Sequence, residues 1–264
     1  MCEGVSAMIE LLNVSKKFNE GTVNETTIFT DFNLKVNKGE FVSIVGSNGS
    51  GKTTLLNLIA GTLSCDAGKI ILNGKDITSK KEFQRAAKMG RVFQDPSKGV
   101  AGDMTIAENM SLADNKGKLY GLTMGISKKR VEYYRELVSQ LGLGLETKMD
   151  IKMGLLSGGQ RQAVALLMAT MTPIDFLILD EHTAALDPHT AEIIMELTDK
   201  IVKEKNLTAI MVTHNLRYAV DYGTRLLMMD KGNIIIDKSG KEKQKTEVDD
   251  ILDIFNKISI ECGN

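Results

Sequence analysis

Residues 46–53 read Gly46-Ser47-Asn48-Gly49-Ser50-Gly51-Lys52-Thr53, which fits the phosphate-binding pattern G-x-x-x-x-G-K-[ST]. The apolar run Phe41-Val42-Ser43-Ile44-Val45 precedes this loop, and the helical pattern Leu55-Leu56-Asn57-Leu58-Ile59-Ala60 follows it. Glycines let consecutive backbone N–H groups converge on phosphate oxygens, and the N-terminus of the following helix adds a positive partial charge. The stretch therefore predicts a strand, a glycine turn and a helix that together bind nucleotide phosphates.

The polar side chains of this loop each have an expected partner. We expect Lys52 to reach the β- and γ-phosphates, Thr53 to ligate Mg²⁺ and Thr54 to donate to the α-phosphate. Kinases and GTPases share the loop, so it indicates phosphate binding and leaves the reaction open.

Two acids end a second apolar run, Phe176-Leu177-Ile178-Leu179-Asp180-Glu181. The run is too unbroken for a half-exposed strand, so it predicts a central parallel strand with helices on both faces. We expect Asp180 to hold the Mg²⁺ shell through water and Glu181 to polarise the water that attacks the γ-phosphate. Either acid alone fits a solvated strand end, whereas the pair favours a catalytic site.

A third motif, Leu156-Ser157-Gly158-Gly159-Gln160-Arg161-Gln162, has the features of an anion-binding helix end. It offers a serine at a helix N-cap, two glycines that permit close approach, and a helix that begins at Gln160. The chain resembles the nucleotide-binding subunit of an ATP-binding cassette (ABC) transporter, because its motifs occur in the order typical of that family from Phe18 to His214. The resemblance implies that this helix end binds the γ-phosphate held by the loop of a second copy, so that the ATPase works as a dimer.

The same resemblance assigns further positions one at a time. Gln94 matches the glutamine that contacts Mg²⁺ and the attacking water, and His214, after the apolar strand 209–213, matches the histidine that touches the γ-phosphate. Asp187 matches the loop that passes between the two subunits. Phe18 stands where many members have a tyrosine that stacks on adenine, and it keeps the aromatic face. The expected catalytic residues are Glu181, His214 and Gln94, and the expected metal residues are Thr53, Gln94 and Asp180. The residues expected to bind the nucleotide are Phe18, Gly46, Ser47, Asn48, Gly49, Ser50, Gly51, Lys52, Thr53, Thr54, Ser157, Gly158, Gly159 and Gln160.

One position departs from the family pattern. His182 follows the expected catalytic glutamate, where most relatives have proline. It either loosens that turn or places a titratable group near the γ-phosphate. We interpret it as a subgroup difference without a catalytic role.

Composition excludes several other classes of protein. Charged residues make up 25% of the chain and the formal net charge is −1, which gives no electrostatic case for nucleic-acid binding. No apolar stretch approaches the roughly 20 residues needed to cross a bilayer, and residues 1–7 contain no signal-peptide core. The 3 cysteines are dispersed and match neither a metal site nor a disulfide framework.

The predicted fold is α/β: a P-loop NTPase (RecA-like) core with an antiparallel β subdomain and an inserted helical subdomain. The core is expected at about 8–83 and 162–235, the helical subdomain at about 84–161, and a C-terminal amphipathic helix, capped from Thr246, at about 246–260. Within the helical subdomain, Thr105-Ile106-Ala107-Glu108 predicts a capping box. Lys231-Gly232-Asn233 is typical of a hairpin turn.

These features predict an ATPase that uses ATP and Mg²⁺ to power a membrane transporter, an importer of a small organic solute such as an amino acid. The expected partners are a second copy of the chain, transmembrane permease subunits on separate chains and an extracytoplasmic solute-binding protein. The expected location is cytoplasmic and peripheral, on the inner face of the cell membrane. An exporter subunit and a soluble ABC ATPase of iron–sulfur cluster assembly remain alternatives, because fold analogy does not supply the substrate.

Overall fold

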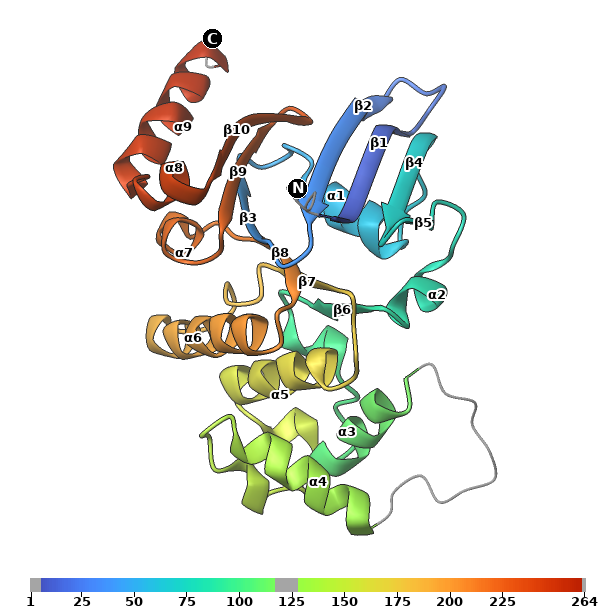
Figure 1. Cartoon of the computed structure of the whole chain (residues 1–264), viewed down its shortest axis with the longest axis vertical. Coiled ribbons are helices and arrows are strands. Elements are labelled where there is room, and N and C mark those ends of the chain that lie inside the picture. The colour runs from blue at the N-terminus through green and yellow to red at the C-terminus, as the bar shows by residue number, and fades with distance from the viewer. Residues whose placement is uncertain (1–5, 117–127, 263–264) are drawn as a thin grey trace, which may run out of the picture. The chain divides into compact units, whose positions relative to one another are not determined.

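The computed structural model describes residues 6–116 and 128–262. The chain forms two compact units: unit 1 comprises Met1–Ala86 and Asn206–Asn264, and unit 2 comprises Ala87–Lys205. Figure 1 labels the helices and strands of both.

Unit 1 contains an antiparallel sheet built from the first part of the chain. Strands β1 (Ala7–Phe18) and β2 (Thr26–Asn37) pair along their length, and β4 (Ala67–Leu72) and the short β5 (Lys75–Asp76) complete the order β2-β1-β4-β5. Alternate apolar residues of β1, among them Ile9 and Leu11, are fully buried, as a sheet with one covered face requires. This sheet is the predicted antiparallel β subdomain.

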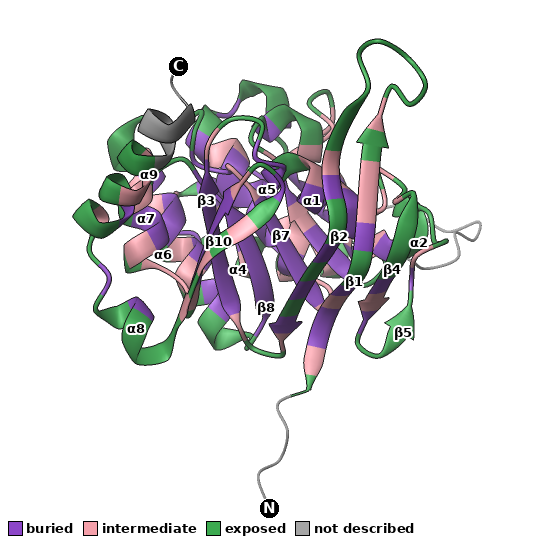
Figure 2. Cartoon of the chain, turned by 90° about the horizontal axis from the view of Figure 1, so that it is seen from above, coloured by how far each residue is buried: buried purple, intermediate pink, exposed green. Residues whose placement is uncertain are grey.

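The remaining strands of unit 1 carry the phosphate loop. Strand β3 (Phe41–Gly46) lies parallel to both β8 (Thr208–Val212) and β9 (Arg225–Asp230), and β10 (Asn233–Ser239) extends the order to β10-β9-β3-β8. Every residue of β3 and β8 is buried, as Figure 2 shows, which is why both strands read as unbroken apolar runs. Helix α1 (Lys52–Ala60) begins directly after the loop.

Four further helices of unit 1 are α2 (Glu82–Ala86), α7 (Leu216–Asp221), α8 (Gly240–Gln244) and α9 (Val248–Cys262). Ile251 of α9 packs in a buried cluster with Val45 of β3 and Ala219 of α7. The predicted N-cap of the last helix is wrong: the Thr246 hydroxyl donates to the carbonyl of Glu242, and the carboxylate of Asp250 accepts from the N–H of Glu247.

Unit 2 combines a parallel strand pair with the helices of the middle of the chain. Strand β6 (Met89–Val92) lies parallel to β7 (Phe176–Asp180), and the helices are α3 (Ile106–Asp114), α4 (Lys128–Ser139), α5 (Gly158–Thr170) and α6 (Pro188–Glu204). The 3₁₀ turns are η1 (Pro96–Gly99), η2 (Leu145–Thr147) and η3 (Met153–Leu155). Apolar residues of α3, α4, α5 and α6 share one buried core.

One local prediction for unit 2 is confirmed, and one stretch differs. Thr105 caps α3 in a capping box with Glu108. Residues 89–92, which the sequence places in the predicted helical subdomain, form a strand. They pair with β7, which lies far along the chain, so the local sequence does not reveal this pairing. The subdomain boundaries proposed from the sequence remain a prediction.

Candidate active site

The phosphate loop of unit 1 has the backbone of an anion cradle. Gly46, Gly49 and Gly51 all have positive φ, with values of 157°, 80° and 101°. Gly51 is the N-cap of α1 and provides no side-chain cap, so none of the first N–H groups of that helix is satisfied by a capping side chain. A Cβ on Gly46 would lie 2.2 Å from the carbonyl oxygen of Met229, which explains the need for glycine at the close of β3. The loop therefore presents a helix N-terminus to an anion.

Lys52 is folded over this loop. Its ammonium group donates to the carbonyl oxygens of Gly46 at 2.8 Å and Ser47 at 2.9 Å, and the residue is only 5% exposed. Thr53 is exposed and Thr54 is half-buried, both in the first turn of α1. The loop thus gathers a cation, two hydroxyls and backbone N–H groups at one place, which is the donor set that nucleotide phosphates require.

A hairpin turn braces the loop from the other side. Strands β9 and β10 are joined by Lys231 and Gly232, which both have positive φ, as the predicted hairpin requires. The Ser47 hydroxyl donates to the carboxylate of Asp230 at 2.9 Å, and the Gly232 N–H donates to the carbonyl of Ser50 at 3.1 Å. Asp230 and Gly232 therefore hold the phosphate loop at two points.

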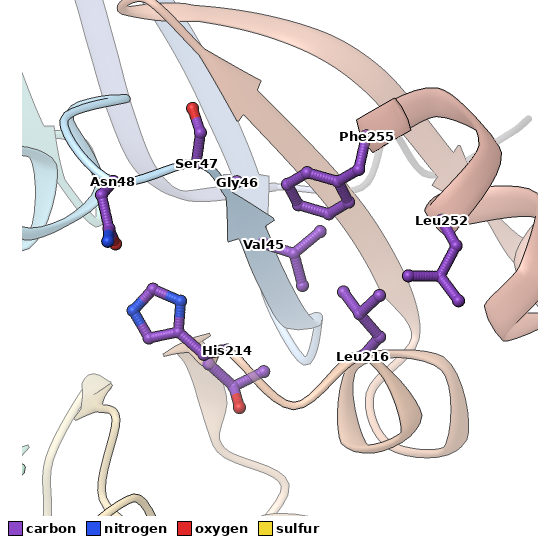
Figure 3. A pocket seen from close by; sticks show the side chains of 9 residues that line it. Val45, Gly46, Ser47, Asn48, His214, Leu216, Leu252 and Phe255 are labelled. Atoms are coloured by element: carbon purple, nitrogen blue, oxygen red, sulfur yellow. The ribbon is translucent and has the colours of Figure 1, made fainter. Parts of the chain in front are cut away.

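His214 lies beside the start of the phosphate loop. A pocket of ≈ 300 Å³ is lined by Val45, Gly46, Ser47, Asn48, Thr213, His214, Leu216, Leu252 and Phe255. Figure 3 shows the His214 ring below the loop that carries Asn48, with the Phe255 ring of α9 close to Val45. The structure therefore brings the predicted histidine and the phosphate loop to one pocket and adds the C-terminal helix to its wall.

Phe18 ends β1 and is not among the residues that line this pocket. It is half-buried, and the Lys16 ammonium lies 5.5 Å from the centre of its ring. One aromatic ring with a cation against it can still offer a stacking face to a base.

In unit 2, the two acids lie at the end of β7 as predicted. The carboxylate of Asp180 accepts a hydrogen bond from Arg91 of β6 at 2.9 Å, and each of these side chains is 14% exposed. Glu181 has a φ of 47°, and its backbone carbonyl accepts from the N–H of Ala184 at 2.9 Å, so the chain turns sharply at the expected catalytic glutamate. A left-handed backbone costs a non-glycine residue about 1 kcal/mol, which the surrounding packing must offset.

His182 belongs to the core of unit 2. The residue is 2% exposed, and burial lowers the pKa of its imidazole to about 4. Its Nε2 lies 3.0 Å from the hydroxyl of Thr198, and that hydroxyl donates to the carbonyl of Ile194 at 2.7 Å. Since the hydroxyl has one hydrogen, Nε2 must be the donor, and because the lowered pKa keeps the ring neutral, its one proton is on Nε2. This agrees with a structural rather than a catalytic histidine.

The signature helix end has the predicted serine N-cap, but the helix begins at Gly158 and not at Gln160, and its two glycines differ in role. The Ser157 hydroxyl accepts from the N–H of Gln160, and the Gln160 side chain accepts from the N–H of Ser157, both at 3.2 Å. A Cβ on Gly159 would lie 2.1 Å from Cγ2 of Thr190, so Gly159 is required by packing against α6. Gly158 is exposed and stays available for close approach of an anion.

Gln94 is exposed just after β6, and the residue before it is tied to the signature helix. The Gln162 side chain of α5 donates through Nε2 to the carbonyl of Phe93 at 3.1 Å, although Gln162 is fully buried. The structure therefore links the segment of Gln94 to the helix that begins at the signature.

The ABC transporter family model matches residues 29–184, which is more than half of the chain. This chain belongs to the ABC transporter family. It is an ATP-binding subunit of that family, with the P-loop NTPase fold and ATPase activity of the cassettes.

Relatives of this ABC subunit align over nearly its whole length. It is 46% identical to a tyrosine transport ATP-binding protein of Clostridioides difficile, covering 94% of this chain and 98% of that one. It is 32% identical to a phosphonates import ATP-binding protein of Lactococcus lactis, covering 92% and 98%. Among solved structures, the ADP conformation of the cassette MJ1267 matches with a TM-score of 0.79 and 28% identity, covering 98% of this chain and 99% of that one. A dimeric cassette bound to ADP and Pi matches with a TM-score of 0.75 and 29% identity, covering 88% and 98%.

Three residues that belong to the candidate site of this ABC subunit were not identified from the sequence. Arg91 is a charged residue within an apolar strand, and Asp230 is a charged residue at the end of one. Asp180 has the same kind of position and was identified by it. Gln162 lies inside the signature motif, but only the structure shows that its side chain points to the segment of Gln94. Within the residues that the structure describes, no helix is both long and apolar enough to span a bilayer.

Proposed function

We propose that this ABC ATPase powers an importer of a small organic solute, and that an amino acid such as tyrosine is the transported class. The observation that supports this most is the alignment, at 46% identity and over 94% of the chain, with a protein described as serving tyrosine transport. The phosphonate relative also belongs to an import system. Both relatives are transport subunits, which favours the transporter over a soluble cluster-assembly ATPase.

In the proposed reaction, the residues of unit 1 hold the nucleotide. The base stacks on Phe18, the phosphates lie on the cradle of residues 46–54, and Lys52 turns from the loop carbonyls to the β- and γ-phosphates. His214, in the pocket beside the loop, contacts the γ-phosphate. The cradle glycines and the uncapped N-terminus of α1 fit this ligand.

The residues proposed for Mg²⁺ are Thr53, Asp180 and Gln94. Hydroxyl, carboxylate and amide oxygens are the donors that this hard cation prefers, so the side chains fit it. When bound, Mg²⁺ neutralises charge on the phosphates. Glu181 then accepts a proton from the attacking water, and Gln94 orients that water.

A second copy of the chain completes the site in this proposal. The Ser157 helix end binds the γ-phosphate held by the loop of the other copy, and Asp187 lies in the loop between the copies. A related cassette forms a dimer with ADP and Pi, which supports this arrangement. The Ser157 capping box rigidifies the helix end, so its dipole is aimed before the nucleotide arrives.

We propose that permease subunits dock on the segment that follows Gln94, residues 95–110. In unit 2 the N–H groups of Met153 and Gly154 donate to the carbonyls of Met104 and Gly102, so the segment lies beside η3. Leu155 of η3 is 78% exposed. An exposed leucine beside a glycine-containing loop suits an apolar contact with a membrane subunit. The complex lies on the cytoplasmic face of the membrane, and an extracytoplasmic solute-binding protein delivers the solute.

Transport in proteoliposomes tests this proposal. The chain is co-purified with its permease, reconstituted with ATP inside the vesicles, and given solute-binding protein and labelled tyrosine outside. We expect tyrosine to accumulate inside, and Glu181→Gln to abolish the accumulation. Efflux driven by the same ATP would instead identify an exporter. ATPase stimulation by a soluble cluster-assembly scaffold and by no permease would refute the transporter.

Crosslinking tests the docking segment separately. In a chain with Cys2, Cys65 and Cys262 replaced by serine, single cysteines are placed at the exposed positions Asp103 and Leu155. We expect both to crosslink to the permease, whereas a cysteine at exposed Glu196 of α6 does not. Crosslinking at Glu196 alone would contradict the docking site.

A further inference from the structure

Arg91 lies where it can act on the carboxylate of Asp180. Strands β6 and β7 are parallel, and the register sets Arg91 opposite Ile178. Side chains alternate along a strand, so Asp180 lies on the same face as Ile178, one step further toward the end of β7. The Arg91 side chain spans that step, and its Nη2 donates to Oδ2 of Asp180 at 2.9 Å.

The guanidinium of Arg91 is oriented by a second contact. Its Cζ lies 4.7 Å from the centre of the Phe93 ring, a stacking that adds to the ion pair. The carbonyl of Phe93 in turn accepts from the buried side chain of Gln162 at 3.1 Å. The flat face of the guanidinium stacks on Phe93 and its Nη2 bonds to Asp180. These two contacts keep the Arg91 side chain in one rotamer, so its charge stays beside Asp180.

This ion pair is only partly screened. Both side chains are 14% exposed, so little water lies between the guanidinium and its surroundings. A cation held at hydrogen-bond distance from a carboxylate opposes the approach of a second cation to the same carboxylate. It also reduces the repulsion between that carboxylate and an anion such as a nucleotide phosphate.

We propose that Arg91 sets how strongly nucleotide binding depends on Mg²⁺, because its guanidinium competes with the metal for the charge of Asp180. The inference rests on the metal role proposed above for Asp180. While Arg91 is present, the Asp180 carboxylate repels a metal-free nucleotide less, and the affinity for nucleotide rises less when Mg²⁺ is added. Without Arg91, the carboxylate repels metal-free nucleotide and attracts Mg²⁺ more strongly.

Fluorescent nucleotide binding measures this dependence without any turnover. The dissociation constant of N-methylanthraniloyl-ATP is determined for the full chain in excess Mg²⁺ and in EDTA, and the ratio of the two constants is the readout. We expect Arg91→Met to raise the preference for the Mg²⁺ form at least threefold. Arg91→Lys keeps the positive charge but loses the stacking and the fork that hold it beside Asp180, so we expect its ratio to lie between those of the parent and Arg91→Met.

Two further variants isolate the cause. Arg135→Met removes an arginine whose ion pair with Glu132 is exposed on α4, and we expect an unchanged ratio. Asp180→Asn removes the carboxylate, and we expect it to abolish most of the Mg²⁺ preference. If Asp180→Asn retained the parent ratio, the role proposed for Asp180 would itself be wrong.

The outcome for Arg91 decides the inference when Asp180→Asn behaves as expected. An unchanged ratio in Arg91→Met would show that the ion pair is only structural, and a lowered ratio would show that Arg91 assists the metal. Either result overturns the proposal. If circular dichroism shows that Arg91→Met does not fold, Arg91→Gln takes its place with the same expectation.

Discussion

Acid should destabilise this protein through the buried His182. The imidazole of His182 is 2% exposed, and burial lowers its pKa to about 4, from an ordinary value of 6.5. In the unfolded chain the same ring takes up its proton near pH 6.5. Between these values the unfolded state binds a proton that the folded state does not. Stability from the neutral ring is therefore complete above about pH 6.5 and is lost as the pH falls toward 4.

The size of the effect follows from the two pKa values. The full difference is worth about 3 kcal/mol, and about 2 kcal/mol of it is lost between pH 7.5 and pH 5. For a chain of this length, a loss of that size lowers the melting temperature by about 4 to 8 °C.

Urea unfolding followed by circular dichroism at pH 7.5 and pH 5 tests this prediction. The variant is His182→Gln, whose amide can still donate to the Thr198 hydroxyl but cannot take up a proton. We expect the parent to lose about 2 kcal/mol more than His182→Gln over this pH range. The control is His189→Gln at an exposed position, which should follow the parent. Equal pH dependence in the parent and in His182→Gln would refute the reasoning.

Four more predictions concern the nucleotide. Lys52→Ala should weaken ATP binding about 100-fold, measured by fluorescent nucleotide titration, because it removes a charged donor from the phosphates. Glu181→Gln should bind ATP within about threefold of the parent and hydrolyse it at least roughly 100-fold more slowly, because the glutamate acts only as water attacks. In sedimentation, Glu181→Gln should dimerise with Mg-ATP and not with Mg-ADP, and adding Ser157→Arg should leave it monomeric by filling the anion site. Asp230→Ala should weaken ATP binding about threefold to tenfold by releasing the Ser47 hydroxyl, whereas an unchanged affinity would mean that the hairpin does not brace the loop.

Local signals in the sequence determined much of the fold. The strand, glycine loop and helix at residues 41–60 formed as predicted, because buried parallel strands and phosphate loops each need residue types that few other structures tolerate. The capping box at Thr105 and the N-cap at Ser157 were also predicted, since a cap is complete within four consecutive residues. The predicted Thr246 cap was wrong because the Thr246 hydroxyl bonds to the carbonyl of Glu242 in the preceding turn. Residue propensity alone does not tell which of these two hydrogen bonds the hydroxyl makes.

The sequence by itself also named the residues proposed to meet the nucleotide, through the spacing within each motif and the resemblance to the family. Only the tertiary structure decided which partners hold those residues in place. Arg91 reaches Asp180 through the register of two strands far apart in the chain, and Ser47 meets Asp230 in the same manner. Gly159 is glycine because Thr190 of another helix occupies the space of its Cβ. His182 is neutral because it is buried in the core of unit 2, where water is excluded from its ring. Contacts of this kind depend on register and packing between distant segments, and no periodicity along the chain encodes them.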